Sequence, residues 1–213
     1  MDGNKNTVII DLTNPLDEYY VPFSRGNYTD PPLEVKDWSS ISREGFRVSR
    51  ISLGTQSGTH IDAPAHFLEN GVTLESLSPE QFIGKYFLLN LPNAMSLPDV
   101  AETLKTYRGE KILFLRTPEN QSAKQSREAI QLILSLPSVL LVLSGDIDVD
   151  DAEPFAFHRL VATAAKFLVE DLDQKEAHRV TGKGEIFIFP LRLSGVSGSP
   201  CRVVARIPGK NNR

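Results

Sequence analysis

Residues Gln56-Ser-Gly-Thr-His60-Ile-Asp62-Ala-Pro-Ala-His66 place two of the four histidines of the chain, an aspartate and a glutamine within eleven residues. In an extended backbone, successive side chains point to opposite faces, so residues at even spacing share one face. We therefore expect Gln56, His60, Asp62 and His66 to line one surface, provided that the segment stays extended. Imidazole and carboxylate groups that converge in this way suit a divalent metal.

A hydrogen-bond network without a metal is the alternative interpretation of this segment. A single histidine is usually a surface or structural residue. Four polar groups on one face are harder to accommodate, because imidazole and carboxylate are costly to bury without partners. The spacing favours a metal site over the network and leaves both open.

The length and charge of the chain predict one soluble globular domain over residues 1–213. The net charge of −4 offers no footprint for phosphate backbones, so we expect a small-molecule substrate and no nucleic acid. The single cysteine, Cys201, excludes an intrachain disulfide. The amino terminus lacks the pattern of a secretion signal, and no apolar run is long enough for a membrane span. These features together predict a cytoplasmic protein.

Hydrophobic periodicity predicts an α/β protein with a mixed sheet. Residues 19–37 are too irregular for a regular element, and we expect them to form a loop that covers the substrate. Residues 146–150 resemble the start of a calcium loop but lack its later ligands, so a solvated turn is expected there. The expected strands cover residues 8–12, 46–53, 86–91, 111–116, 139–143, 166–170, 185–193 and 202–207, and the longer helices cover 97–107, 122–136 and 155–165.

A family resemblance becomes visible over most of the chain. Residues 58–66, Gly-Thr-His-Ile-Asp-Ala-Pro-Ala-His, match all but the first histidine of the motif His-x-Gly-Thr-His-x-Asp-x-Pro-x-His. This motif is the hallmark of the cyclase family of metal-dependent hydrolases, which includes bacterial kynurenine formamidases and isatin hydrolases. Ile10-Asp-Leu-Thr-Asn-Pro15, His158-Arg-Leu with Glu170-Asp-Leu, and the chain after Pro190 resemble further family markers in the same order.

This resemblance implies a swivelling β/β/α fold, a homodimer or homotetramer, and one or two divalent ions, zinc or manganese. His60 and Asp62 would be ligands of one ion, with Asp62 available to bridge to a second. His158 and Glu170 would complete the second position. His66 would stand beside the metals, and we assign it to proton transfer.

Position 56 departs from the family pattern, because Gln56 stands where most members have a histidine ligand. An amide oxygen is a weaker ligand for zinc than imidazole, although manganese and magnesium accept it. Gln56 could therefore be a metal ligand, could bind substrate, or could mark a lost reaction.

The expected reaction is hydrolysis of an amide, formamide or cyclic amide by metal-activated water. A metal-assisted cyclase or dehydratase, and a non-catalytic binding descendant of the family, are the alternatives. Tyr19, Tyr20 and Phe23 are expected to stack on an aryl substrate, with ordinary loop packing as the competing interpretation.

Overall fold

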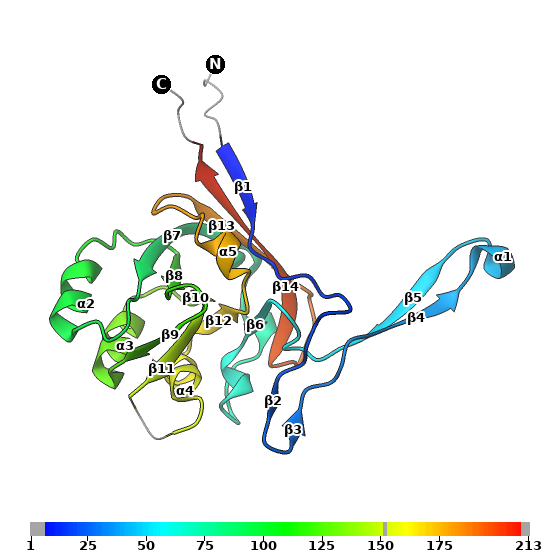
Figure 1. The fold of residues 1–213 in the computed structure, drawn as a ribbon, viewed down its shortest axis with the longest axis horizontal. Coiled ribbons are helices and arrows are strands. Elements are labelled where there is room, and N and C mark those ends of the chain that lie inside the picture. The colour runs from blue at the N-terminus through cyan, green and yellow to red at the C-terminus, as the bar shows by residue number, and fades with distance from the viewer. Residues whose placement is uncertain (1–6, 151–152, 210–213) are drawn as a thin grey trace.

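The computed structural model describes residues 7–150 and 153–209. The expectation that the amino terminus is not a secretion signal falls partly on residues 1–6, which lie outside the described residues. Its centre is an eight-stranded mixed sheet (Figure 1). The α/β class expected from the sequence is confirmed. The strands of this sheet, in spatial order, are β1 (Thr7–Asp11), β14 (Gly198–Pro208), β13 (Glu185–Pro190), β7 (Ile83–Asn90), β8 (Ile112–Arg116), β10 (Leu140–Ser144), β12 (Phe167–Glu170) and β6 (His60–Asp62).

The parallel half of the sheet consists of β7, β8, β10 and β12, which are connected through helices. Strands β8 and β10, at the centre of this half, read as nearly continuous apolar runs because both of their faces are buried. Ser96 and Ser126 cap the amino-terminal ends of α2 and α3 by accepting hydrogen bonds from Asp99 N and Ala129 N. The covering helices are α2 (Leu97–Leu104), α3 (Arg127–Leu134) and α4 (Ala156–Thr163).

The antiparallel half closes the sheet on itself, because β14 pairs with β13 and β1 along most of its length and with β6 at its start. One apolar core, with Phe114 and Val203 among its members, lies inside this closed sheet. A second core, with Leu113 and Ile130 among its members, lies between the sheet and the helices. The closure brings β6, and with it His60 and Asp62, between two long-range partners.

Several sequence expectations were wrong at element boundaries or in element type. The helix expected over 122–136 starts only at Arg127, because residues 122–125 form strand β9, which pairs with β11 (Asp146–Val149). The same pairing makes residues 146–149 a strand instead of the expected turn. Strand β14 begins at Gly198 instead of residue 202, because its first three residues pair with β6.

Residues 19–37, expected to be irregular, contain strands β2 and β3 and the first residues of strand β4. Strands β2 (Ser24–Arg25) and β3 (Tyr28–Thr29) form one small hairpin. Strand β4 (Glu34–Ser39) pairs with β5 (Val48–Ser52), and the four-residue helix α1 (Ile41–Glu44) lies at the tip of this ribbon. The ribbon projects away from the body of the protein (Figure 1).

Short helical turns complete the described structure. The segment after Ser78 begins with a capping box, as its sequence predicts, and forms a 3-10 helix over Pro79–Phe82. A further 3-10 turn covers Leu74–Ser76, and α5 covers Gln174–Ala177. In the described part of the chain, none of the helices has the length and hydropathy of a membrane span.

Candidate metal centre

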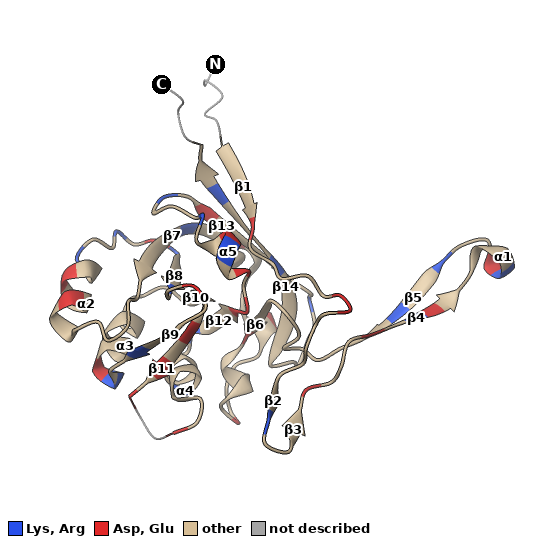
Figure 2. Cartoon of the chain, in the orientation of Figure 1, with Lys and Arg blue, Asp and Glu red and all other residues tan. Residues whose placement is uncertain are grey.

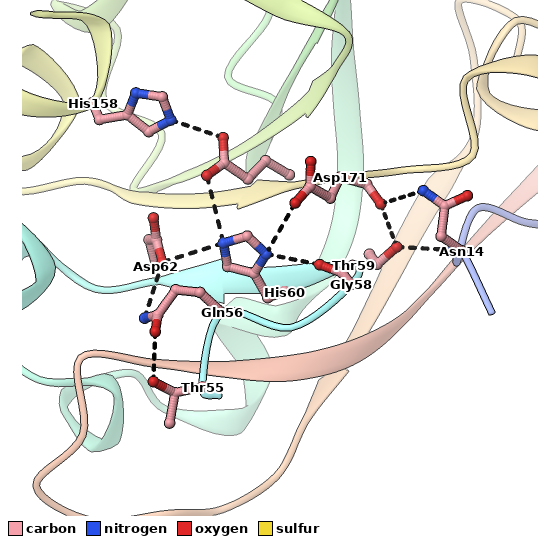
Figure 3. Close-up of polar contacts among 10 residues, drawn as sticks. Asn14, Thr55, Gln56, Gly58, Thr59, His60, Asp62, His158 and Asp171 are labelled. Carbon is pink, nitrogen blue, oxygen red and sulfur yellow. Dashed lines mark hydrogen bonds and ion pairs between the residues drawn. The ribbon is translucent and has the colours of Figure 1, made fainter. Parts of the chain in front are cut away.

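Strand β6 presents His60 and Asp62 on one buried face. Its antiparallel pairing with β12 sets Glu170 directly opposite His60, and residues opposite each other in such a pair share a face. The Nε2 atom of His60 lies 3.5 Å from Asp62 Oδ1 (Figure 3). The same atom lies 3.5 Å from Glu170 Oε1. One nitrogen and two carboxylate oxygens therefore lie within 4.8 Å of one another. This donor set is suited to a divalent cation.

The orientation of His60 points Nε2 at the two carboxylates, where such a cation would lie. Its Nδ1 lies 2.8 Å from the carbonyl oxygen of Gly58, an arrangement in which Nδ1 carries the proton and donates it (Figure 3). Gly58 has φ of 60°, and an added Cβ would meet Leu16 at 2.8 Å. The glycine of the motif thus permits the turn that delivers the carbonyl oxygen to the ring.

His158 reaches the same carboxylate from another element. It lies on α4, and its Nε2 is 3.0 Å from Glu170 Oε2, while the other oxygen of Glu170 faces His60. Glu170 therefore stands between two imidazoles that are far apart in the sequence. The candidate cluster of metal ligands itself consists of His60, Asp62 and Glu170.

The shifted pKa values of the clustered side chains reflect an excess of buried negative charge. Burial and the neighbouring Glu170 raise the pKa of Asp62 to about 7, although the charge of His60 opposes this rise. Burial acts to lower the pKa of His60, but hydrogen bonding to Glu170 and the charges of Asp62, Glu170 and Asp171 outweigh it and raise that pKa to about 10. A bound divalent ion would supply the positive charge that this cluster attracts. The residues present fit a metal.

A common face for Gln56, His60, Asp62 and His66 was expected on the condition that the segment stays extended. The backbone does not meet this condition over the whole motif. Only residues 60–62 are strand, and residues 64–66 form the 3-10 helix Pro64–His66. Gln56 and Asp62 nevertheless approach each other, with Gln56 Nε2 3.4 Å from Asp62 Oδ1. Convergence comes from turns at Gly58 and Pro64 in place of one continuous strand.

The amide of Gln56 faces the centre with its nitrogen. Nε2 donates to Asp62 and lies 3.4 Å from Ser197 Oγ, while Oε1 accepts a 2.6 Å hydrogen bond from the hydroxyl of Thr55 (Figure 3). An amide nitrogen donates hydrogen bonds and does not ligate a metal. In this arrangement Gln56 is not positioned as a ligand itself but donates a hydrogen bond to the candidate ligand Asp62. Gly198 makes room for it, because a Cβ there would lie 2.5 Å from Gln56 Nε2.

His66 lies on the wall of a cavity of about 950 Å³ that opens in front of the centre. Partial burial and the positive charge of His60 lower the pKa of His66, so its imidazole is neutral at pH 7. Its ring packs edge-on against Phe67, with centroids 4.6 Å apart. A neutral imidazole beside the cluster can accept a proton from a group in the cavity.

Aromatic rings form one wall of this cavity. Phe155 lies 6.0 Å from Phe23 and 5.8 Å from Phe67 between ring centroids, and the guanidinium of Arg25 stands 4.7 Å above it. Of the three residues expected to stack on a substrate, Phe23 lines the cavity, whereas Tyr19 and Tyr20 are not among the lining residues. Tyr19 is instead 80% exposed.

Sequence reasoning missed Asp171 and Phe155. Asp171 Oδ2 lies 3.7 Å from His60 Nδ1, and the Asp171 side chain is otherwise exposed. Both residues have left-handed backbones, with φ of 56° and 58°. Such conformations are strained for residues other than glycine and are frequent at functional sites. The position of Asp171 directly after Glu170 in the sequence could have predicted that it lies at the site. No sequence feature could have predicted this for Phe155.

The fold and the centre together define an α/β protein with a buried His/Asp/Glu site at the junction of β6 and β12. The family model Cyclase, described as "Putative cyclase", matches residues 10–171. The chain belongs to this family.

Known relatives and solved structures agree with this assignment. A kynurenine formamidase of Bacillus mycoides is 26% identical over 95% of this chain and 99% of its own length. Isatin hydrolase A from Labrenzia aggregata has a TM-score of 0.79 at 18% identity, covering 95% of this chain and 94% of that one. A potential metal-dependent hydrolase with cyclase activity has a TM-score of 0.72 at 20% identity, covering 96% of this chain and all of the other. The swivelling fold expected from the motif is therefore confirmed.

Proposed function

We propose that this protein is a metal-dependent hydrolase that cleaves the carbon–nitrogen bond of an amide, formamide or cyclic amide. The observation that carries the proposal is the buried cluster of His60, Asp62 and Glu170 at the base of a large cavity. Relatives named kynurenine formamidase and neighbours named isatin hydrolase support an amide substrate.

Zinc or manganese would be held by His60, Asp62 and Glu170, and His158 with Glu170 would hold a second ion. A divalent ion at such a site lowers the pKa of water and polarises a carbonyl group. Gln56 would keep the carboxylate of Asp62 in place through the hydrogen bond from Nε2. For Gln56 itself to be a ligand, its side-chain amide would have to rotate so that Oε1, and not Nε2, faces the ion.

His66 would transfer the proton of the reaction. Its lowered pKa keeps the ring neutral at the start, so it can take a proton from the attacking water. It would then return that proton to the leaving nitrogen. The edge-on contact with Phe67 would hold the ring at the cavity wall, where both the attacking water and the leaving nitrogen could reach it.

The substrate would be a small aryl compound. Phe23, Phe67 and Phe155 give the cavity an aromatic wall of mutually tilted rings next to the metal ligands. Aromatic faces favour offset or edge-on contacts with a substrate ring.

The test is hydrolysis of an aryl formamide and of isatin by protein loaded with zinc or manganese. His66→Ala should retain its metal and lose turnover by about 10²–10⁴-fold, as expected for removal of a general base. His178→Ala provides the matched control, because His178 does not line the cavity. Full turnover by His66→Ala would refute the assigned role.

Product analysis separates hydrolysis from the two alternatives. Hydrolysis incorporates one oxygen atom from labelled water, whereas a dehydratase does not. A metal-loaded protein that turns over neither compound, and no related amide, would favour a binding descendant.

A further inference from the structure

The backbone pairing that joins the two ligand-bearing strands ends at the ligands themselves. Strand β6 pairs with β12 through three residues, and the last pair is His60 with Glu170. The next pair along the same register would be Thr59 with Asp171. Asp171 instead has a left-handed backbone, with φ of 56°, which turns the chain out of the ladder. Backbone hydrogen bonds of β6 with β12 therefore stop where the metal ligands lie.

This end of the strand pair also carries like charges. Asp62 and Glu170 each direct a carboxylate oxygen at Nε2 of His60. Neither β6 nor β12 contains a lysine or an arginine, and Figure 2 shows the basic residues on other elements. Like charges at neighbouring positions on one face destabilise a pair of strands. In the ion-free protein this repulsion acts to separate the two strands.

Three residues from distant parts of the chain take the place of the missing backbone pair. The hydroxyl of Thr59 donates a 2.6 Å hydrogen bond to the carbonyl oxygen of Asp171. The side-chain amide of Asn14 donates a 2.8 Å hydrogen bond to the same oxygen (Figure 3). The backbone N–H of Asn14 in turn donates to Thr59 Oγ1 at 2.9 Å. Asn14, Thr59 and Asp171, here termed the clamp, thus form a closed ring of hydrogen bonds.

The segment that carries Asn14 is itself fixed to the sheet. The hydroxyl of the preceding residue, Thr13, donates to the carbonyl oxygen of Val203 at 3.2 Å and accepts from the N–H of Val203 at 2.9 Å. Val203 belongs to β14, which also pairs with β6. The opening marker of the sequence, residues 10–15, therefore reaches the metal centre through Asn14.

We propose that the clamp sets the spacing of the metal ligands, and that Thr59 and Asn14 are positioning residues for the ion. Thr59 directly precedes His60, and Asp171 directly follows Glu170, so a shift at the clamp moves both ligands. The clamp would hold His60 Nε2 and Glu170 Oε1 at their 3.5 Å separation against the repulsion of the carboxylates. A site that is ordered before binding loses less affinity to the cost of ordering. This inference rests on the metal binding of the proposed function and not on its reaction.

Thr59 and Thr13 provide a matched pair of substitutions. Each hydroxyl donates to one backbone carbonyl and accepts from one backbone N–H, but the partner of Thr13 is β14 and not a ligand-bearing strand. Replacement by valine keeps the shape of the side chain and removes the hydroxyl. Thr59→Val and Thr13→Val should both lower the melting temperature of the ion-free protein. Thr59→Val alone should change the binding of the ion.

The test is binding of cobalt(II) to the full chain, measured by competition with a chromophoric chelator. The visible absorption of the bound cobalt reports its coordination geometry. Thr59→Val should weaken binding by about 10–100-fold, as expected for loss of a group that orients ligands, and should shift the absorption bands. Thr59→Ser, which restores the hydroxyl, and Thr13→Val should both keep the wild-type affinity and spectrum.

A second variant keeps the test decisive if Thr59→Val does not fold. Asn14→Ala removes the other donor to the Asp171 carbonyl oxygen and leaves Thr59 in place, so we expect cobalt binding to weaken several-fold. Wild-type affinity and spectrum in the folded Thr59→Val or Asn14→Ala variant would overturn the proposal. Equal weakening by Thr13→Val would also overturn it, because general loss of stability would then explain the effect.

The same measurements separate this inference from the proposed function. A wild-type chain that binds no cobalt would refute the metal centre and the role of the clamp together. A wild-type chain that binds cobalt, with the expected loss in Thr59→Val, supports the clamp even if no amide is hydrolysed. In that case only the proposed reaction would be wrong.

Discussion

The metal centre and the hairpin of β2 and β3 face the same cavity but are held in place in different ways. His60, Asp62 and Glu170 lie on paired strands, so backbone register fixes their separation. The hairpin brings Phe23 and Arg25 to the cavity, and their ring contacts with Phe155 join it to the body. We infer that the centre sets whether the reaction occurs, whereas the hairpin sets which substrate binds and how tightly.

The largest effect should come from the carboxylate that the two imidazoles share. Glu170→Gln removes the negative charge opposite His60 and His158 while keeping the size of the side chain. Metal content should fall, and kcat/KM on an aryl formamide should fall by at least about 10³-fold, because the ion is the main source of electrostatic stabilisation. Elemental analysis and steady-state kinetics measure both quantities. Wild-type metal content with wild-type kcat/KM would remove Glu170 from the centre.

A smaller change is expected at Gln56, which touches a ligand. Gln56→Ala should weaken metal binding by about 10-fold, because partners that orient ligands contribute effects of 10–100-fold. Gln56→His should instead tighten metal binding by adding an imidazole nitrogen to the donor set. Competition with a chromophoric chelator gives both dissociation constants. Equal affinities in the two variants and the wild type would show that position 56 has no influence on the ion.

The hairpin should affect substrate binding more than chemistry. Phe23→Ala removes a ring from the cavity wall, and we expect KM to rise several-fold while kcat and metal affinity change little. Tyr19→Ala is the matched control, because the ring of Tyr19 does not line the cavity. A rise in KM for Tyr19→Ala would instead support the role that the sequence suggested for this residue.

The smallest effect concerns an ion pair remote from both regions. The hydrogen bond from Arg202 lowers the pKa of Asp11 below its usual 3.8, so the pair stabilises the fold above that pH and ceases to do so as pH falls through the lowered value. Asp11→Asn should therefore lower the melting temperature slightly at pH 7. The difference should vanish when Asp11 is protonated in the wild type. Thermal melts over a series of decreasing pH values, starting at pH 7, give the comparison. A difference that does not shrink as the pH falls would contradict it.

The sequence allowed prediction of those site residues whose positions depend on short-range geometry. His60 and Asp62 alternate along a strand, so their common face followed from spacing alone. His158 and Glu170 followed only from the family resemblance, because the pairing of β6 with β12 joins segments more than a hundred residues apart. No local pattern could reveal that contact.

Other features depend on side-chain orientation or on tertiary closure. The direction of the Gln56 amide is set by Thr55 and Ser197, and Ser197 belongs to the distant end of the chain. The left-handed backbone of Phe155 could not be predicted from the sequence, because phenylalanine usually avoids this conformation. The early start of β14 results from its pairing with β6, which a turn-rich sequence conceals.

The central claim is that the cluster of His60, Asp62 and Glu170 holds a divalent ion on which amide hydrolysis depends. The most direct measurement is turnover of an aryl formamide during titration of chelator-stripped protein with zinc or manganese. Our account predicts no turnover in the stripped protein and a rise that saturates at one or two ions per chain. Full turnover by the stripped protein, or metal binding that leaves every tested amide intact, would contradict it.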